Sequence, residues 1–425
     1  MGTIVYIDDL AEIKKVFAGD PATYHAGEAN SMLRGMLGPS SILVVDDELH
    51  RQRRRSMLEP FHRDAVNRQA GAMARIAAAN IATWPVGRTF PVAPRMSEIT
   101  LEVILRTVVG ASDPIRLAEL RQVMPKLLNL TPFALLSISN PDLQRKWPWR
   151  NIRRHLADAD RLLYAEIAER RRDPDLDSRH DALAMLVRGD MQRDHRMTDA
   201  ELRDQLMTLL IAGHDTTATG LSWALERLTR HPAVLAKAVQ AAEASASGDP
   251  SGDEYLDAVA KETLRVRPVV FDVGRVLTKP VELAGYHLPP GVMVAPAVGL
   301  VHSTPTLFPE PRKFDPERMT GSAFTPASWM PFGGGVRRCL GATFAMTEMR
   351  VVLREVLLRT ELATTTKPGE RQKVKHVILV PHKGARIGVT RLKSPVPLST
   401  ELQAQVRGNA PSPMPEDCCP SDRNM

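Results

Sequence analysis

Residues 332–341 read FGGGVRRCLG, and they carry more structural information than any other stretch of the chain. Cys339 lies just ahead of a predicted helix, where unpaired backbone N–H groups and the helix dipole favour an anionic sulfur. The three glycines allow the backbone to turn sharply and to approach a large group, while Phe332 and Arg337 add an apolar wall and a cation. The stretch therefore predicts a pocket for a bulky anionic cofactor beside a thiolate.

The remaining sequence predicts a mainly α-helical chain with small β-sheets, an α+β fold. Thr198 and Glu201 form the capping box of a long helix that ends at Pro232. The apolar character of this helix persists on most of its faces, which predicts a course through the middle of the protein. Further helices are expected over Glu254–Val266 and after Cys339. Short strands are expected at residues 3–7, 275–277, 292–296 and 377–380.

The composition is that of an ordinary globular protein. Of the 425 residues, 43% are hydrophobic and 25% are charged, and the net charge is +7. Because this mild basicity comes without an aromatic platform or a recognisable binding module, no nucleic-acid partner is expected. The sequence has no run of about 18 apolar residues and no apolar leader, which predicts a cytoplasmic protein without a transmembrane anchor. Of three cysteines, Cys418 and Cys419 are neighbours in a polar segment, so no disulfide framework is expected.

FGGGVRRCLG resembles the haem-binding signature of the cytochromes P-450, Phe-x-x-Gly-x-Arg-x-Cys-x-Gly. All five fixed positions are filled, by Phe332, Gly335, Arg337, Cys339 and Gly341. The resemblance implies a bacterial-type cytochrome P-450 fold, with haem b between the long central helix and the cysteine loop, and Cys339 as the axial iron ligand. A thiolate there donates electron density to the iron and favours cleavage of the O–O bond. The alternative is a free cysteine in a glycine-rich turn.

The central helix carries the segment AGHDTT at residues 212–217. Ala212 and Thr216 share one face, and the small pair Ala212 and Gly213 would let a flat ligand lie close to the backbone. A threonine inside a helix can also divert a carbonyl hydrogen bond and open a bulge. The segment is similar to the family's acid and alcohol pair, which implies that Asp215 and Thr216 deliver protons during oxygen activation. The alternative is a buried helix in which both residues are incidental.

A further motif, KETLR at residues 261–265, places Glu262 and Arg265 three apart on one helical face. This spacing alone indicates an ordinary surface ion pair. Similarity to the family implies instead a buried network completed by Arg318 of the segment FDPERM. Such a network is structural and locks the coil that carries the cysteine loop, so loss of one partner would leave a buried charge uncompensated.

The resemblance also implies cations for the two haem propionates. His50 and Arg54 share a helical face, Arg275 begins a strand, and Arg337 lies two residues before the cysteine. A solvated helix face is expected for the neighbouring arginines Arg51, Arg53 and Arg55. Together with Arg338, they should surround the thiolate side of the haem. There they would attract a small acidic ferredoxin or a flavodoxin-type redox partner.

The resemblance divides the chain into a catalytic domain over residues 1–392 and a disordered tail over residues 393–425. The catalytic domain is expected to lack the family's usual first helix and strand. The segment KWPWRNIRR at residues 146–154 is interpreted as the lid of the substrate channel, with a membrane-surface contact or an ordinary packed loop as alternatives.

The leading functional hypothesis is a monooxygenase that activates O2 with electrons derived from NAD(P)H. Its substrate is expected to be a hydrophobic small molecule, because the expected pocket walls, such as Met207–Ile211 and Val269–Val273, are apolar. Two alternatives stay open. One is a peroxide-using or isomerising haem-thiolate enzyme, against which the pair Asp215 and Thr216 argues, and the other is a catalytically incompetent haem-binding protein.

Overall fold

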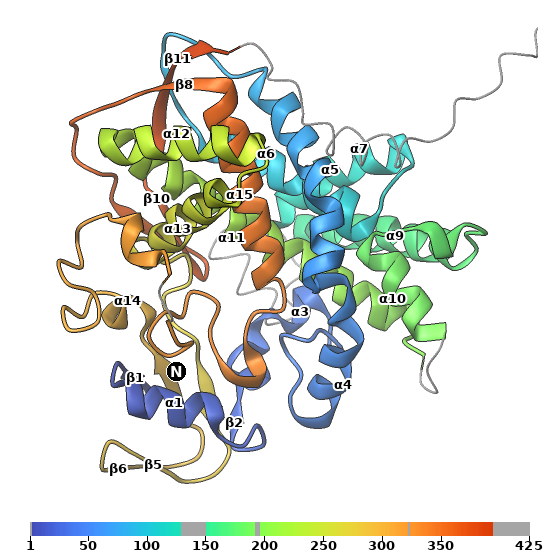
Figure 1. Cartoon of the computed structure of the whole chain (residues 1–425). Helices are drawn as coiled ribbons and strands as arrows, with labels where there is room; N and C mark the ends of the chain where they lie inside the picture. Colours follow the sequence, from blue (N-terminus) through green and yellow to red (C-terminus); the bar gives the residue numbers. More distant parts are fainter. Residues whose placement is uncertain (1, 129–149, 192–195, 322–323, 394–425) are drawn as a thin grey trace, which may run out of the picture.

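The computed structural model describes residues 2–128, 150–191, 196–321 and 324–393 (Figure 1). Trp147 and Trp149 of the expected lid lie outside these ranges, as do Cys418, Cys419 and all of the expected tail after Lys393. Within the described ranges, none of the helices combines the length and the apolar character that a membrane span requires.

Helices dominate the described chain, which confirms the prediction of a mainly α-helical protein with small sheets. In chain order they are α1 (Leu10–Ala18), α2 (Ala26–Ala29), α3 (Arg34–Leu37), α4 (Asp47–Met57), α5 (Arg63–Ile81), α6 (Ala93–Ile104), α7 (Pro114–Leu128), α9 (Arg150–Arg171), α10 (Ala182–Met191), α11 (Asp199–Arg230), α12 (Pro232–Ala246), α13 (Pro250–Val266), α14 (Val298–Val301) and α15 (Ala342–Arg359). A π-helical turn, Leu105–Val109, continues α6 as far as Gly110, whose left-handed φ of 72° ends it.

The strands pair into small sheets. The largest sheet has the order β1–β7–β4–β2, and its members are β1 (Ile4–Ile7), β7 (Met293–Pro296), β4 (Arg275–Leu277) and β2 (Tyr24–His25). Ile4 of β1 lies opposite Met293 in a parallel pair, whereas β4 is antiparallel to both of its neighbours. The other sheets are formed by β3 (Thr89–Pro91), β11 (Arg386–Leu392) and β8 (Thr360–Ala363), by β5 (Val281–Leu283) with β6 (Tyr286–Leu288), and by β9 (Gln372–Lys375) with β10 (Ile378–Pro381).

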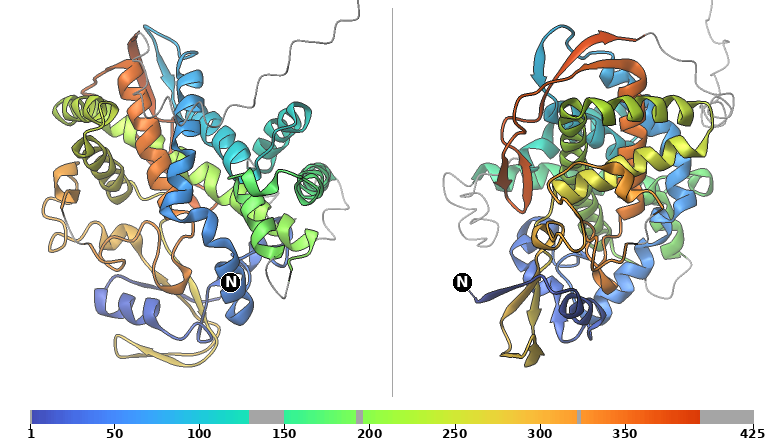
Figure 2. Two further views of the ribbon diagram at one scale, coloured as in Figure 1. Left: turned by 45° about the vertical axis from the view of Figure 1, so that its right-hand side comes forward. Right: turned by 60° about the vertical axis from the view of Figure 1, so that its left-hand side comes forward.

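The long helix α11 runs through the middle of the helical part, as predicted (Figure 2). Its capping box is formed as expected: the Thr198 hydroxyl accepts from the Glu201 N–H, and the Glu201 carboxylate accepts from the Thr198 N–H at 2.8 Å. The helix contacts α6, α9, α13 and α15, and it buries Trp223 completely. It is therefore the element against which the other helices are positioned.

Predicted element boundaries hold to within a few residues. The helix α13 begins at Pro250 rather than Glu254, because Asp249 accepts from the Ser251 N–H as its N-cap and proline suits the first helical position. The strand at 275–277 matches, and the other three expected strands are each off by one residue at one or both ends. Local capping and turn residues thus account for these boundaries.

The buried apolar side chains of the described structure form two large cores and a small third cluster around Phe308. The larger core is built mainly from α5, α6, α11 and α15, and the smaller one lies between α1 and the four-stranded sheet. Figure 1 shows α1 and this sheet below the mass of helices, with the chain that leads into α15 passing between them. The cysteine loop therefore lies where the two parts of the molecule meet.

Candidate functional site

The cysteine loop is held by its own backbone. The Cys339 N–H donates to the Phe332 carbonyl at 2.8 Å, and α15 begins three residues later at Ala342. Although Cys339 keeps exposed surface, the protein atoms around the sulfur desolvate it and raise its pKa, against the opposite effects of the Gly341 N–H, Arg54 and Arg338. The Gly341 N–H at the helix start thus favours an anionic sulfur as expected, but desolvation by the surrounding protein outweighs it.

The glycines of the loop serve two different purposes. Gly335 has a φ of +64°, and a Cβ at this position would lie 2.0 Å from the carbonyl oxygen of Phe17. A Cβ at Gly334 would lie 2.3 Å from the Phe17 ring. The absent side chains of these two glycines therefore make room for α1. At Gly341 a Cβ would meet nothing within 4 Å, so this glycine borders open space.

Four basic side chains form a cationic cluster, defined as His50, Arg54, Arg275 and Arg337. They come from α4, β4 and the cysteine loop, and their charges act on one another. Among the described residues, Asp46 is the carboxylate that pairs with the cluster, through Arg337. Arg337 also donates to the carbonyls of Ile42 at 3.3 Å and Val45 at 2.7 Å, and Arg275 to that of Gly274 at 2.9 Å.

Burial makes this cluster electrostatically unfavourable by itself. Desolvation, followed by the charges of Arg337 and Arg54, lowers the pKa of His50 to about 3, and desolvation, followed by Arg337, lowers the pKa of Arg275 to about 10. An anionic group placed here would relieve the repulsion. Arg54 also acts on the Cys339 sulfur, so the cluster and the thiol border the same space. The residues therefore fit a haem, with the cluster facing its propionates and Cys339 its iron.

The residues of the AGHDTT segment face different surroundings around α11. The Thr216 hydroxyl donates to the Ala212 carbonyl at 2.7 Å, and Ala212 is exposed on the same face. No bulge opens along the described α11, so the expected distortion is absent although the hydroxyl bond is present. Gly213 does not face this side, because a Cβ there would lie 2.5 Å from Ile104 of α6. Its small size serves helix packing, which corrects its assignment to the cofactor.

Asp215 and His214 have partners that lie far away in the sequence. The Asp215 carboxylate pairs with Lys375 of β9 at 2.8 Å. His214 is buried against α6, where Ser97 lies 3.1 Å from Nε2 and Thr100 lies 2.9 Å from Nδ1. Both contacts span more than 100 residues, so no local pattern signals them.

Glu262, Arg265 and Arg318 form a closed network, the name kept for these three residues below. Glu262 receives two hydrogen bonds from Arg265, at 2.7 and 2.8 Å, and one from Arg318 at 3.2 Å. The remaining Arg265 donors reach the carbonyls of His302, Pro311 and Lys313 at 2.8, 2.9 and 3.1 Å. The structure thus brings the three together in the interior and ties α13 to the coil ahead of the cysteine loop.

Comparison with known proteins places this geometry in a family. The sequence model of the family described as Cytochrome P450 matches residues 2–389. The chain belongs to the cytochrome P450 family. The assignment agrees with the cationic cluster beside Cys339, and P450 proteins as a family are haem-thiolate monooxygenases.

Named relatives are P450 proteins of mycobacteria. The chain is 66% identical to a protein of Mycobacterium tuberculosis provisionally named cytochrome P450 135B1, over 97% of this chain and 88% of that protein. It is 39% identical to the likewise provisionally named cytochrome P450 135A1 of the same organism, over 88% of this chain and 82% of that protein.

Solved P450 structures share the fold. The retinoic acid-bound cyanobacterial CYP120A1 superposes with a TM-score of 0.76 and 25% sequence identity, covering 92% of this chain and 89% of that one. The haem domain of cytochrome P450DA gives a TM-score of 0.77 at 24% identity, with 92% and 88% of the two chains covered. The predicted P450 fold is thereby confirmed.

Proposed function

We propose that this P450 is a cytoplasmic monooxygenase that oxygenates a hydrophobic small molecule with electrons passed from NAD(P)H through a ferredoxin- or flavodoxin-type partner. The observation that carries the proposal is the cationic cluster, which lies beside the exposed thiol of Cys339. When bound, haem b would supply oxygen activation and electron transfer to the reaction.

Each part of the chain then has a distinct task. Cys339 would hold the iron, and the cationic cluster would hold the propionates and orient the macrocycle. Thr216 presents a hydroxyl on the haem-facing side of α11, and Asp215, one residue earlier, carries a carboxylate at the wall of a solvent-accessible cavity. Together the two side chains would pass protons from that cavity toward the reacting oxygen.

The ligation is tested by absorption spectroscopy of the purified holoenzyme. The carbon-monoxide adduct of the reduced protein should show the red-shifted Soret band of a thiolate ligand, and Cys339→His should abolish that shift while still binding haem. A wild-type spectrum of the imidazole-ligated kind would overturn the assignment of Cys339.

The proton-delivery role is tested by the coupling of electron use to product. Thr216→Val should lower the product formed per NADPH consumed by roughly tenfold, because the hydroxyl is lost. Ser222→Ala is the matched control, since Ser222 makes the same bond to the carbonyl four residues before it, at 2.6 Å to Ala218, away from the Ala212 and Thr216 face. Equal coupling in the two variants would contradict the role of Thr216.

The partner is proposed to dock on exposed arginines of the thiolate side. Arg51, Arg55 and Arg338 are exposed, whereas Arg53 is buried and forms an ion pair with Glu201, which removes it from the expected solvated face. Electrostatic steering by the exposed three predicts that the rate of reduction by an acidic ferredoxin falls steeply with ionic strength. A rate that is independent of salt would contradict this surface.

The alternatives predict different outcomes. Product formation from peroxide, but not from NADPH with a ferredoxin and its reductase, would favour a peroxide-using or isomerising enzyme. Stoichiometric haem with neither reaction would favour a catalytically incompetent haem-binding protein.

A further inference from the structure

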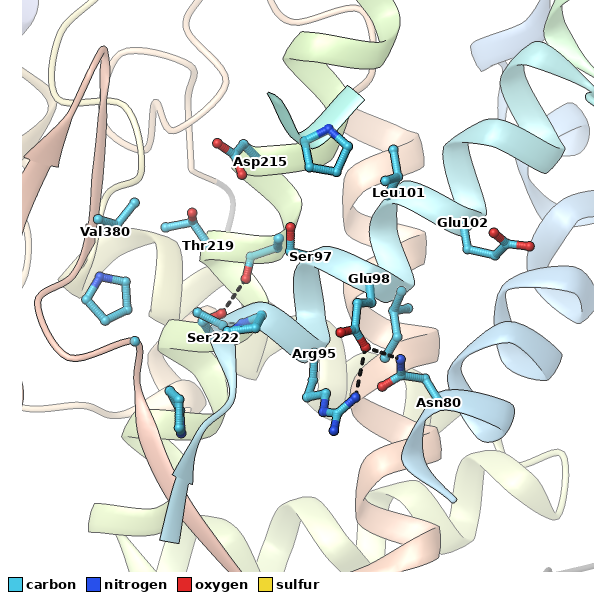
Figure 3. Close-up of a pocket in the computed structure, with 18 of the residues that line it drawn as sticks. Asn80, Arg95, Ser97, Glu98, Leu101, Glu102, Asp215, Thr219, Ser222 and Val380 are labelled. Carbon is cyan, nitrogen blue, oxygen red and sulfur yellow. Dashed lines mark hydrogen bonds and ion pairs between the residues drawn. The ribbon is translucent and has the colours of Figure 1, made fainter. Parts of the chain in front are cut away.

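A large cavity of about 1450 Å³ opens on a different face of α11 from the proposed haem site. Asp215, Thr219 and Ser222 line it at the spacing of one helical stripe, and Ser97, Glu98 and Glu102 of α6 form the adjoining wall (Figure 3). The β9–β10 hairpin closes the opposite side, where Val380 lies. The cavity is large enough for a lipid-sized molecule.

Cations outnumber carboxylates in this cavity. Its described lining includes six permanently charged basic residues and three acidic ones: Arg75, Arg95, Arg106, Arg121, Lys373 and Lys375 against Glu98, Glu102 and Asp215. The lining is therefore positively charged even when every carboxylate is ionised. Because the same lining holds apolar side chains such as Ile76, Leu101 and Val380, it combines an apolar surface with an excess of positive charge.

The ion pairs show where the excess lies. Glu98 pairs with Arg95 at 3.1 Å, and Asp215 pairs with Lys375 at 2.8 Å. Glu102 is shared by two arginines, Arg106 at 2.5 Å and Arg121 at 2.6 Å.

Two of the lining cations carry no compensating charge. Arg75 and Lys373 are exposed, and neither has an ion-pair or hydrogen-bond partner among the described residues. They come from opposite walls, α5 and β9. Two uncompensated cations and one doubly shared carboxylate leave room for an external anion without loss of any pair already formed.

The hairpin that carries Lys373 also shows a local strain. His376 follows β9 in the two-residue connection to β10, and its φ is +56°. Glycine is favoured at such a position, and a residue with a side chain there is strained. This side chain lines the cavity, so the hairpin presents a histidine and two lysines to it at the expense of an easier turn.

We propose that this cavity binds an amphipathic carboxylic acid, with its carboxylate attracted by the uncompensated charges of Arg75 and Lys373 and its chain against Ile76, Leu101 and Val380. The site is separate from the haem face of α11, so it does not rest on the proposed function. Guanidinium and ammonium groups pair strongly with carboxylates, and Arg121 already does so with both oxygens of Glu102.

The test uses a diazirine derivative of lauric acid and the haem-loaded enzyme. After photolysis, peptide mapping should place cross-links on α5, α6, α11 and the β9–β10 hairpin. The double variant Arg75→Glu/Lys373→Glu should reduce these cross-links by about tenfold at equal probe concentration, because two attractions become repulsions. Lys14→Glu, a charge reversal on exposed α1, is the matched control and should leave them unchanged.

Two further measurements keep the site distinct from the haem pocket. The uncharged methyl ester of the same probe should label the cavity about tenfold less, and the Soret response to lauric acid should be the same in the wild type and the double variant. Labelling that is equal for acid and ester, equal in the double variant, or confined to peptides around Cys339 would overturn the proposal. A colourless protein that still labels at the cavity would refute the proposed function and leave this site standing.

Discussion

The closed network and the cationic cluster are two groups of buried charge, and they are built on opposite principles. In the closed network, every oxygen of the Glu262 carboxylate and most donors of Arg265 have protein partners. In the cationic cluster, the carboxylate of Asp46 forms an ion pair with Arg337 alone among the four basic side chains. A buried charge group that satisfies itself stabilises the fold, whereas one with an excess of one sign is prepared for an external ligand. The comparison separates a structural motif from a binding motif without reference to conservation.

The largest effect should come from opening the closed network. Glu262→Gln removes the charge that compensates Arg265 and Arg318, and the free energy of unfolding should fall by about 3–5 kcal/mol, measured by denaturant titration of the haem-loaded protein. Glu361→Gln is the matched control, because its pair with Arg391 is exposed and is worth less than about 1 kcal/mol. Similar losses in the two variants would show that the network is not closed.

Removing a cation from the cationic cluster should affect haem far more than folding. Arg275→Gln should release haem to a scavenger protein roughly tenfold faster, because a charge-assisted contact is lost. The stability of the haem-free protein should change by less than about 1 kcal/mol, since the lost hydrogen bond to Gly274 is offset by relief of the repulsion from Arg337. A large loss of stability without haem would place Arg275 in the structural class instead.

Substitutions at Gly335 and Gly341 should likewise differ, one affecting the stability of the fold and the other the binding of haem. Gly335→Ala forces a left-handed residue against Phe17 and should cost about 1–2 kcal/mol in the protein with and without haem. Gly341→Ala should leave the haem-free protein nearly unchanged and slow haem uptake, because its Cβ enters open space. Both quantities can be read from denaturant titrations and stopped-flow absorbance. The comparison fails if Gly341→Ala is the more damaging change in the absence of haem.

The smallest effect is a pH dependence shared by the two groups. Desolvation lowers the pKa of His302 beside the closed network to about 3, with Arg265 as the next cause, and the pKa of His50 is also about 3. Each histidine takes up a proton near pH 6.5 in the unfolded chain but only near pH 3 in the folded chain. The free energy of unfolding therefore has its full value above pH 6.5 and falls as the pH drops toward 3. The loss should be about 1 kcal/mol per histidine between pH 7.5 and pH 6 in the haem-free protein.

A diamagnetic haem analogue distinguishes the two histidines. Zinc protoporphyrin should raise the pKa of His50, because its propionates bring negative charge to the cationic cluster, and should leave that of His302 unchanged. Imidazole NMR titration measures both values in one sample. An equal shift of both would mean that the cluster does not face the propionates.

What the sequence could predict follows from the range of each interaction. The capping box of α11 and the pairing of Glu262 with Arg265 span three residues, so their patterns can be read directly. The third member of the network, Arg318, is 56 residues away from Glu262 and was found only through resemblance to a family. Periodicity also indicated the general course of α11, because a helix that is apolar on most faces must be buried.

The sequence could not predict the surroundings of residues whose contact partners lie far away in the chain. The glycines of the cysteine loop predict the close approach of a cofactor, and in the structure Phe17 occupies the space beside two of them. Ile104 of α6 occupies the space beside Gly213 in the same way. A glycine shows that something approaches the backbone, but the sequence around it does not say whether that is a ligand or another helix. The ion pair between Asp215 and Lys375 spans 160 residues and left no local signal either.

The packing of the Phe17 ring against Gly334 has a consequence for the synthesis of the protein. Translation proceeds at about 5–20 residues per second, so α1 leaves the ribosome on the order of tens of seconds before the loop that receives it. During that interval the Phe17 ring has no cysteine loop to pack against, and Cys339 has not yet been synthesised. The pocket is thus completed only when the last third of the polypeptide folds back onto its beginning, which makes cofactor capture a late event in synthesis.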